Sequence, residues 1–153
     1  MGNGLVDRYN RRIEYFRISI TDRCNLRCFY CMPPSGIRRL PPEEILKYEE
    51  LIEIIKCARE LGIGKFRITG GEPLVRKGII GFIEKLAGLG TDFSLTTNGI
   101  LLNRYARDLF NAGLSRINIS LDTLKESRFN RITGGDDIRE VFSGIDAVRK
   151  LNF

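Results

Sequence analysis

The sequence predicts an α/β fold built on a parallel sheet, and three features of the chain support this prediction. Short runs rich in β-branched and aromatic residues alternate with longer segments whose apolar residues recur at helical spacing. Turns containing glycine separate the two kinds of segment. Cysteines, a glycine pair and polar residues follow directly after the short runs. This is the position at which ligand sites occur in parallel α/β folds. Alternation of this kind argues for a parallel sheet.

The first strand is expected within residues 12–21, where apolar and polar residues alternate imperfectly. A loop containing three cysteines follows it. The first long helix is predicted to begin at the Pro-Pro-Glu-Glu run of residues 41–44, since proline and acidic residues favour the first turn of a helix. Its apolar stripe runs from Ile45 to Ala58, and Gly62 supplies the stop.

The later elements repeat the same unit. Strands are expected at residues 65–69, 92–97 and 115–121, and helices at 77–87, 103–111, 123–130 and 138–151. These elements make four βα units with no linker between them, so one domain is expected. The periodic pattern alone is compatible with a barrel or with a doubly wound sheet.

The composition excludes several classes of function. The chain has no histidine, so it cannot build imidazole zinc sites, Ser-His-Asp triads or histidine acid–base catalysis. It shows neither a secretory signal nor an apolar stretch of transmembrane length, so a cytoplasmic protein without a membrane partner is expected. The net charge of +6 suits solubility or an anionic substrate. No nucleic-acid-binding module is recognisable, so no nucleic-acid partner is expected.

Three cysteines at spacings of four and three residues, Cys24, Cys28 and Cys31, are the strongest chemical signal in the chain. Electron-storing ferredoxin clusters take four cysteine ligands at other spacings. Three thiolates would therefore leave one iron of a cluster without a protein ligand, which suggests chemistry at that iron. Zinc with a fourth ligand from elsewhere is the competing interpretation. Cys57 lies in the first predicted helix and is expected to fill core volume.

The residues around these cysteines resemble the radical S-adenosylmethionine (radical SAM) superfamily and, within it, the GTP 3′,8-cyclase family of molybdenum cofactor biosynthesis (MoaA). The matching blocks are FRISITDRC ending at Cys24, YCMP at 30–33, FRITGGEPLVR at 66–76, SLTTNG at 94–99, RINISLDTL at 116–124 and RITGG at 131–135. This resemblance implies a partial (β/α)6 barrel of the TIM type, of which the chain would hold about four units. It assigns residues 1–153 to the N-terminal part of a radical SAM core domain.

The resemblance also implies two cofactors and a substrate. In the family, the cysteines that match Cys24, Cys28 and Cys31 hold a 4Fe-4S cluster, and S-adenosylmethionine occupies the open iron. The residues that match S-adenosylmethionine contacts are Tyr30, Gly71 and Ser120, and those that match GTP contacts are Arg17, Arg67 and Thr96.

Several of these residues also have a purely structural interpretation. Tyr30 could shield a cluster from water, and the glycine pair at 70–71 could form a tight turn. Ser120 could be a small residue at the end of a strand, and Thr96 could be present for its β propensity. Glu72 is expected to orient the loop that contains the two glycines.

The arginines and the Asn-Gly pair need a separate explanation. Arg17 and Arg67 project from predicted strands toward a barrel interior, where burial of an unpaired charge is costly and a bound anion would offset the cost. Arg76 could also bind an anion, or it could equally cap a surface acid. The pair at 98–99 is expected to shape a turn.

The resemblance implies a lyase reaction. An electron from the cluster cleaves S-adenosylmethionine to methionine and a 5′-deoxyadenosyl radical, which takes hydrogen from C3′ of GTP and leads to 3′,8-cyclo-7,8-dihydro-GTP. It also implies an electron donor such as a flavodoxin or ferredoxin, and a cyclic pyranopterin monophosphate synthase that consumes the product. The family's C-terminal region with a second cluster has no counterpart here, so a fragment is expected. Another radical SAM enzyme, such as a peptide-modifying maturase, and a non-enzymatic zinc-binding module are the alternatives.

Overall fold

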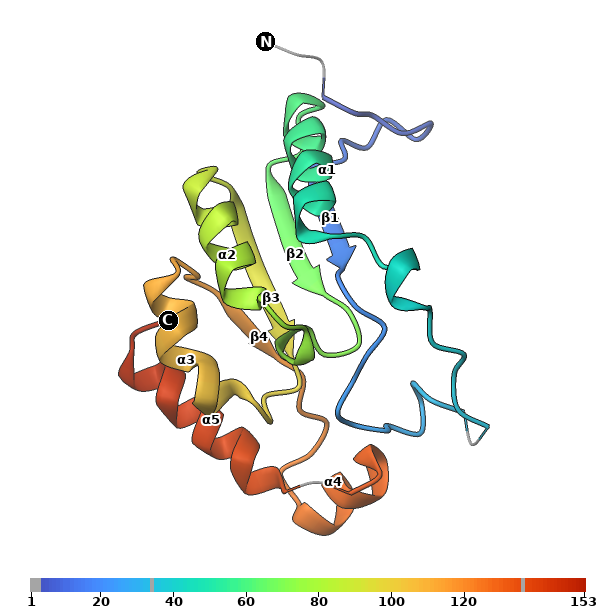
Figure 1. Ribbon diagram of the computed structural model, residues 1–153, viewed down its shortest axis with the longest axis vertical. Coiled ribbons are helices and arrows are strands. Elements are labelled where there is room, and N and C mark those ends of the chain that lie inside the picture. Colours follow the sequence, from blue (N-terminus) through green and yellow to red (C-terminus); the bar gives the residue numbers. More distant parts are fainter. Residues whose placement is uncertain (1–3, 34, 136) are drawn as a thin grey trace.

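Four parallel strands form one sheet in the order β1, β2, β3, β4 (Figure 1). The computed structural model describes residues 4–33, 35–135 and 137–153. The strands are β1 (Tyr15–Ser19), β2 (Lys65–Thr69), β3 (Asp92–Thr97) and β4 (Ile117–Ile119). Neighbouring strands are consecutive in the chain, as in a (β/α) barrel, whereas a doubly wound sheet reverses its strand order. The predicted parallel α/β fold is confirmed, and its strand order is that of a barrel.

Helices connect the strands and follow the last of them. They are α1 (Tyr48–Glu60), α2 (Ile79–Gly88), α3 (Leu102–Asn111), α4 (Glu126–Thr133) and α5 (Ile138–Lys150), with 3-10 turns η1 (Pro42–Glu44) and η2 (Pro73–Val75). The main hydrophobic core takes side chains from α1, α2, α3 and α5 as well as from the strands. These four helices therefore cover one face of the sheet. No helix among the described residues is long and apolar enough to cross a membrane.

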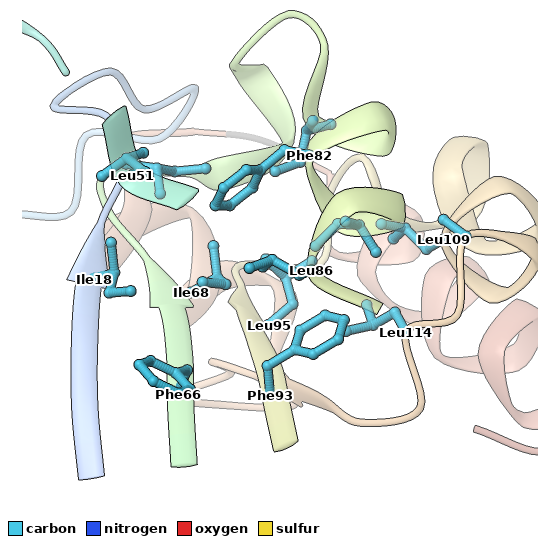
Figure 2. Close-up of a cluster of buried hydrophobic side chains, with 14 of the residues drawn as sticks. Ile18, Leu51, Phe66, Ile68, Phe82, Leu86, Phe93, Leu95, Leu109 and Leu114 are labelled. Atoms are coloured by element: carbon cyan, nitrogen blue, oxygen red, sulfur yellow. The ribbon is translucent and has the colours of Figure 1, made fainter. Parts of the chain in front are cut away.

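The strand register decides which residues face the helices. Ile18, Ile68 and Leu95 are paired across β1, β2 and β3, and all three are buried in the main core (Figure 2). Successive side chains in a strand point to opposite faces. Arg17 and Arg67, which pair with each other one position earlier, therefore lie on the face away from these helices.

The first helix begins later than predicted. Residues 42–44 form the turn η1, Ile45 returns to extended backbone, and α1 starts only at Tyr48. The backbone N–H of Lys47 donates a 2.6 Å hydrogen bond to Glu50 Oε2, which satisfies a free donor at the helix start. The prolines and acidic residues at 41–44 thus start a short turn, and the capping contact at Lys47 starts the helix.

Some other predictions need correction. Cys57 is exposed on α1, because the buried stripe of that helix runs through Leu51, Ile55 and Ala58 instead. The prediction that Cys57 fills the core was wrong. β1 and β4 are also shorter than predicted, since β1 covers only residues 15–19 of the expected 12–21 and β4 only 117–119 of 115–121.

Candidate cluster and nucleotide site

The loops that follow the four parallel strands leave from the same end of the sheet (Figure 1). The longest of them, residues 20–41, follows β1 and contains the three clustered cysteines; we call it the cysteine loop. The loop after β2 contains Gly70, Gly71 and Glu72, the loop after β3 contains Asn98, and Ser120 follows β4. The fold therefore places the cysteines, the glycine pair, Asn98 and Ser120 in loops at the same end of the sheet.

The end of helix α4 holds the cysteine loop in place. Arg27 N–H donates to Thr133 O at 2.9 Å, and Phe29 N–H donates to Ile132 O at 3.0 Å. Leu26 is buried in a second small core that also contains side chains from α4 and α5, and Cys24 and Cys28 pack against it. The RITGG block, which had no assigned role, therefore anchors the loop that carries the cysteines.

The three cysteines are free thiols. Cys24 and Cys28 are half-buried and Cys31 is exposed, and burial raises the pKa of the Cys24 and Cys28 thiols. The N–H groups of Cys31 and Met32 both donate to Cys28 O at 2.9 Å, which closes a turn between the second and third cysteines. In the described part of the chain, no three Cys, His, Asp or Glu side chains converge closely enough to hold a metal ion.

The donor set nevertheless fits an iron–sulfur cluster in its chemistry. Three thiols lie within eight residues of one loop, and the Cys24 sulfur already accepts two hydrogen bonds, from Leu26 N–H at 3.4 Å and from the Asn98 amide at 3.8 Å. Such N–H donors stabilise thiolate ligands and tune cluster potentials.

The glycine pair packs tightly against the cysteine loop. Gly71 N–H donates to Thr21 O at 2.7 Å, and Glu72 N–H donates to Arg23 O at 2.7 Å. A Cβ added at Gly71 would lie 2.3 Å from Arg23 O, and one added at Gly70 would lie 2.6 Å from Thr21 O. Both positions therefore require glycine for close approach of two backbones, which supports the structural interpretation of the pair.

Glu72 is buried, with 1% of its surface exposed, and joins two loops. Its Oε1 accepts hydrogen bonds from Leu74 N–H at 3.0 Å and from the Thr97 hydroxyl at 2.8 Å, and its Oε2 accepts one from Asn98 N–H at 2.7 Å. Burial raises the pKa of this carboxyl, against the opposite effect of these hydrogen bonds. Glu72 thus orients its own loop, as predicted, and also fixes the start of the loop after β3.

The two other residues matched to S-adenosylmethionine contacts lie on different loops. Tyr30 is mostly exposed, and its hydroxyl donates a 2.7 Å hydrogen bond to Asp122 Oδ2. Ser120 is exposed, and its N–H donates to Thr97 O at 2.9 Å, which extends the pairing of β3 and β4 by one residue. The structure brings the β1 loop and the β4 loop into contact through the pair of Tyr30 and Asp122.

Two of the three residues matched to GTP contacts carry a buried polar atom that has no partner in the part of the chain that the structure describes. Arg67 Nε and Thr96 Oγ1 are both buried and have no hydrogen-bond partner among the described residues. Thr96 pairs with Asn118 and alternates with the core residue Leu95, so it lies on the helix-free face together with Arg67. Arg17 lies on the same face and is exposed.

A cavity of about 480 Å³ opens on the helix-free face and along the edge of β4. Polar side chains from the strands line part of it, among them Arg67, Ser94 and Asn118. The guanidinium of Arg67 lies 5.4 Å from the centre of the Tyr15 ring, which also lines the cavity. Arg17 and Thr96 do not line this cavity, so the three residues share a face of the sheet but not one pocket.

Sequence reasoning missed Asp122 and misjudged Arg76. Asp122 comes two residues after Ser120 in the RINISLDTL block, and this place just beyond a strand end was a usable signal. Arg76 was expected to cap a surface acid or to bind an anion. Instead its guanidinium donates to Ile20 O at 2.5 Å and to Leu46 O at 2.6 Å, and it stacks on the Tyr48 ring at 4.1 Å.

A family model described as the radical SAM superfamily matches residues 18–153. This chain belongs to the radical SAM superfamily. The match includes all three clustered cysteines, the glycine pair and the carboxyl ends of all four strands. Of these strands it leaves out only the first three residues of β1.

Curated relatives that are about half identical to this chain carry the name GTP 3′,8-cyclase. A GTP 3′,8-cyclase from Thermodesulfovibrio yellowstonii is 56% identical over 148 residues, which is 95% of this chain and 46% of the relative. A GTP 3′,8-cyclase from Peptoclostridium acidaminophilum is 56% identical over 150 residues, which is 96% of this chain and 46% of the relative. The chain thus spans about half the length of the curated relatives it matches.

Solved structures of other proteins resemble this chain in fold. SuiB of Streptococcus suis, solved with the precursor peptide SuiA, has a TM-score of 0.70 at 20% identity, and the match covers 86% of this chain and 29% of SuiB. The protein anSMEcpe, solved with bound AdoMet, has a TM-score of 0.66 at 22% identity, and the match covers 89% of this chain and 39% of anSMEcpe. At these identities the likeness concerns the fold, and it confirms the predicted partial barrel.

Proposed function

We propose that this chain carries the S-adenosylmethionine-cleaving part of a GTP 3′,8-cyclase, a lyase of molybdenum cofactor biosynthesis. The observation that carries the proposal is its 56% identity to proteins of that name over almost the whole chain. Unsatisfied polar atoms are rare in protein interiors and suggest an absent ligand. Arg67 Nε and Thr96 Oγ1 are buried on one sheet face without a partner among the described residues, and they therefore support a polar, anionic substrate.

Cys24, Cys28 and Cys31 are the proposed ligands of a 4Fe-4S cluster. Such a cluster, when bound, supplies the electron that cleaves S-adenosylmethionine to methionine and a 5′-deoxyadenosyl radical. The chain's own contribution is to hold the three sulfurs on one loop, anchored by the carbonyl groups of Ile132 and Thr133. The protein thereby orients the cofactor and excludes water, while the radical chemistry belongs to the cofactor.

Tyr30, Gly71 and Ser120 are the proposed contacts for S-adenosylmethionine. The N–H of Gly71 is already bonded to Thr21 O, so its carbonyl oxygen is the group proposed to accept from the amino group of the methionine part. The Ser120 hydroxyl and the Tyr30 ring are exposed beside the ends of β4 and β1, where a bound ligand can reach them. The tight packing of the Gly71 loop against the cysteine loop would keep the amino-group contact close to the cluster.

Arg17, Arg67 and Thr96 are the proposed contacts for GTP. Arginine suits this role because its planar guanidinium donates paired hydrogen bonds to phosphate oxygens. All three side chains lie on the helix-free face of the sheet, which is the interior face of a closed barrel. Hydrogen abstraction from C3′ of GTP and attack of that carbon on C8 would leave an unpaired electron on the base. One electron from the electron donor and one proton would then give 3′,8-cyclo-7,8-dihydro-GTP.

The proposal also covers the wider setting of the reaction. Residues 1–153 would form the N-terminal part of the radical SAM core domain. An electron donor such as a flavodoxin or ferredoxin would reduce the cluster, and a cyclic pyranopterin monophosphate synthase would consume the product. A cytoplasmic location belongs to the proposal, because a reducing compartment keeps such thiols available for metal.

Electron paramagnetic resonance of the anaerobically reconstituted, dithionite-reduced chain tests the first half of this proposal. We expect a 4Fe-4S signal whose shape changes when S-adenosylmethionine is added. Folded, colourless protein that binds zinc and does not respond to S-adenosylmethionine would contradict the enzyme interpretation and favour the zinc module.

Equilibrium dialysis with labelled GTP tests the second half. Arg67→Gln is expected to weaken GTP retention by about tenfold, because it removes a charge-assisted contact. Arg149→Gln, which removes the same charge from an exposed position on α5, is the matched control and should leave GTP retention unchanged. Equal retention by both variants would remove the support for GTP at this face, and retention of a peptide in preference to GTP would favour a maturase.

A further inference from the structure

The side chain of Asn98 reaches from the end of β3 to the first clustered cysteine. Its amide nitrogen Nδ2 lies 3.8 Å from Cys24 Sγ and donates a 2.9 Å hydrogen bond to Asn25 Oδ1. Cys24 is 74 residues earlier in the chain. The contact therefore joins the loop after β3 to the cysteine loop at the sulfur that would bind the cluster.

The orientation of this amide is fixed by its other bonds. Asn98 Oδ1 accepts a hydrogen bond from Ile100 N–H at 3.0 Å, which closes an Asx turn. With its oxygen engaged in this way, the NH₂ group must face Cys24 and Asn25. The residue thus does more than shape the turn, which was its expected role.

The backbone of Asn98 is held by a buried carboxyl group. Asn98 N–H donates to Glu72 Oε2 at 2.7 Å, while Glu72 Oε1 accepts from the Thr97 hydroxyl and from Leu74 N–H. Thr97 Oγ1 in turn accepts from Gly99 N–H at 3.1 Å. The position of the Asn98 side chain is therefore determined by Glu72, a residue of the β2 loop with 1% of its surface exposed.

We propose that Asn98 is a positioning residue for the iron–sulfur cluster, and that its amide donates to the Cys24 sulfur and favours the reduced state. A reduced cluster carries one more negative charge, so a donor at a ligand sulfur stabilises it more than the oxidised cluster. Glu72 acts through Asn98, because its carboxylate fixes the loop that presents the amide. This inference rests on the proposed function, since it requires that Cys24 bind a cluster.

Two substitutions of Asn98 test the donor directly. Asn98→Ala removes the amide without adding charge. Asn98→Asp keeps an oxygen for Ile100 N–H but replaces the donor with a second oxygen, so it tests the contact with the Asx turn preserved. Asn111→Asp adds the same charge at an exposed position near the end of α3 and is the matched control. Circular dichroism of each variant establishes that it is folded before its cluster is measured.

The readout is the midpoint potential of the reconstituted cluster, measured by redox titration followed by electron paramagnetic resonance. We expect the ratio of reduced to oxidised cluster at a fixed potential to fall about tenfold in Asn98→Ala, because the lost donor stabilises the reduced cluster more than the oxidised one. For a one-electron couple this change corresponds to about 59 mV. Asn98→Asp should shift the midpoint further in the same direction, and Asn111→Asp should leave it unchanged.

A double-mutant cycle tests the role of Glu72. Glu72→Asp keeps the negative charge but shortens the side chain that holds Asn98 N–H, so it is expected to lower the midpoint in the unchanged chain and to add little in the Asn98→Ala background, because both act through one contact. Full additivity would overturn the assignment of Glu72 as a residue that acts through Asn98. An unchanged midpoint in folded Asn98→Ala and Asn98→Asp would overturn the inference while leaving the proposed function intact. Absence of a cluster in the unchanged chain would overturn both.

Discussion

The hydroxyl of Tyr30 donates a 2.7 Å hydrogen bond to Asp122 Oδ2, although 92 residues separate the two in the chain. Tyr30 lies between two of the clustered cysteines and Asp122 follows the end of β4, so the bond joins the first and last loops at the carboxyl end of the sheet. A protonated phenol is required to donate it. The bond accordingly holds the pKa of Tyr30 well above its ordinary value of 10.

Removal of this bond should be visible in a tyrosine titration. The absorbance change near 295 nm between pH 9 and 11 should be the same in Tyr30→Phe as in the unchanged chain, because Tyr30 does not ionise there. Asp122→Asn should add one ionising tyrosine to that range. Because the folded-state pKa is raised, the stabilising effect of the bond is fully present below pH 10 and is lost as the pH rises through the folded-state value. An unchanged amplitude in Asp122→Asn would contradict the assignment of the bond.

Gly71→Ala should displace the cysteine loop. The new Cβ would lie 2.3 Å from Arg23 O, a backbone atom that cannot move alone. We expect the free energy of unfolding to fall by about 1–3 kcal/mol, in the range for overpacked sites, measured by urea denaturation. Gly81→Ala is the matched control: it lies within α2 with nothing within 4 Å of its new Cβ, so it should stabilise by about 0.5–1 kcal/mol. Equal effects of the two substitutions would be inconsistent with this packing.

Two adjacent threonines should respond in opposite ways to the same substitution. Thr97→Val leaves the buried Glu72 without one donor, so we expect it to lower the free energy of unfolding by about 1–3 kcal/mol. Thr96→Val replaces a buried hydroxyl that has no partner among the described residues, so it should be neutral or slightly stabilising. Thermal or urea unfolding of both variants distinguishes them. A loss of stability in Thr96→Val alone would reverse the assigned roles.

Arg76→Lys should destabilise the start of the cysteine loop at Ile20. Lysine keeps the charge but cannot donate to Ile20 O and Leu46 O in the forked geometry of arginine. Hydrogen bonds to charged groups contribute about 1.5–3 kcal/mol each, so we expect a loss of about 2 kcal/mol in the free energy of unfolding. Hydrogen exchange should also become faster around residue 46. Arg149→Lys on the exposed side of α5 serves as the control and should change neither quantity.

Local signals predicted the strands that lie in the middle of the sheet. The predicted ranges 65–69 and 92–97 match β2 and β3, because both strands combine β-rich residues with glycine or Asn-Gly breaks at their ends. β4 is shorter than predicted, and it lies at the edge of the sheet, where one side has no pairing strand among the described residues. α1 begins late because the helix is capped by the contact of Lys47 with Glu50. The predicted start at residues 41–44 rested on prolines and acidic residues that also favour a helix start, and there they form only the turn η1.

The motifs in the sequence pointed to the residues of the candidate site, but they did not predict the hydrogen bonds between those residues. The bond from Thr97 to Glu72 spans 25 residues, and the one from Asn98 to Cys24 spans 74. Periodicity and spacing carry no information on such pairs, because they depend on how separate loops pack. Glycine at 71 had two possible explanations in the sequence, and only the position of Arg23 O showed that close packing requires it.

The hydrogen bonds from the cysteine loop to residues 132 and 133 determine when that loop can reach its final conformation during synthesis. Arg27 and Phe29 lie near the start of the chain, yet their backbone partners are made more than a hundred residues later. Domains generally fold as units during synthesis, so a domain needs all of its packing partners before it can complete its fold. The three thiols are therefore translated long before the loop that carries them can adopt its final backbone conformation. Any ligand of these thiols would therefore meet an open segment until the end of α4 has emerged from the ribosome, and the anchored loop only afterwards.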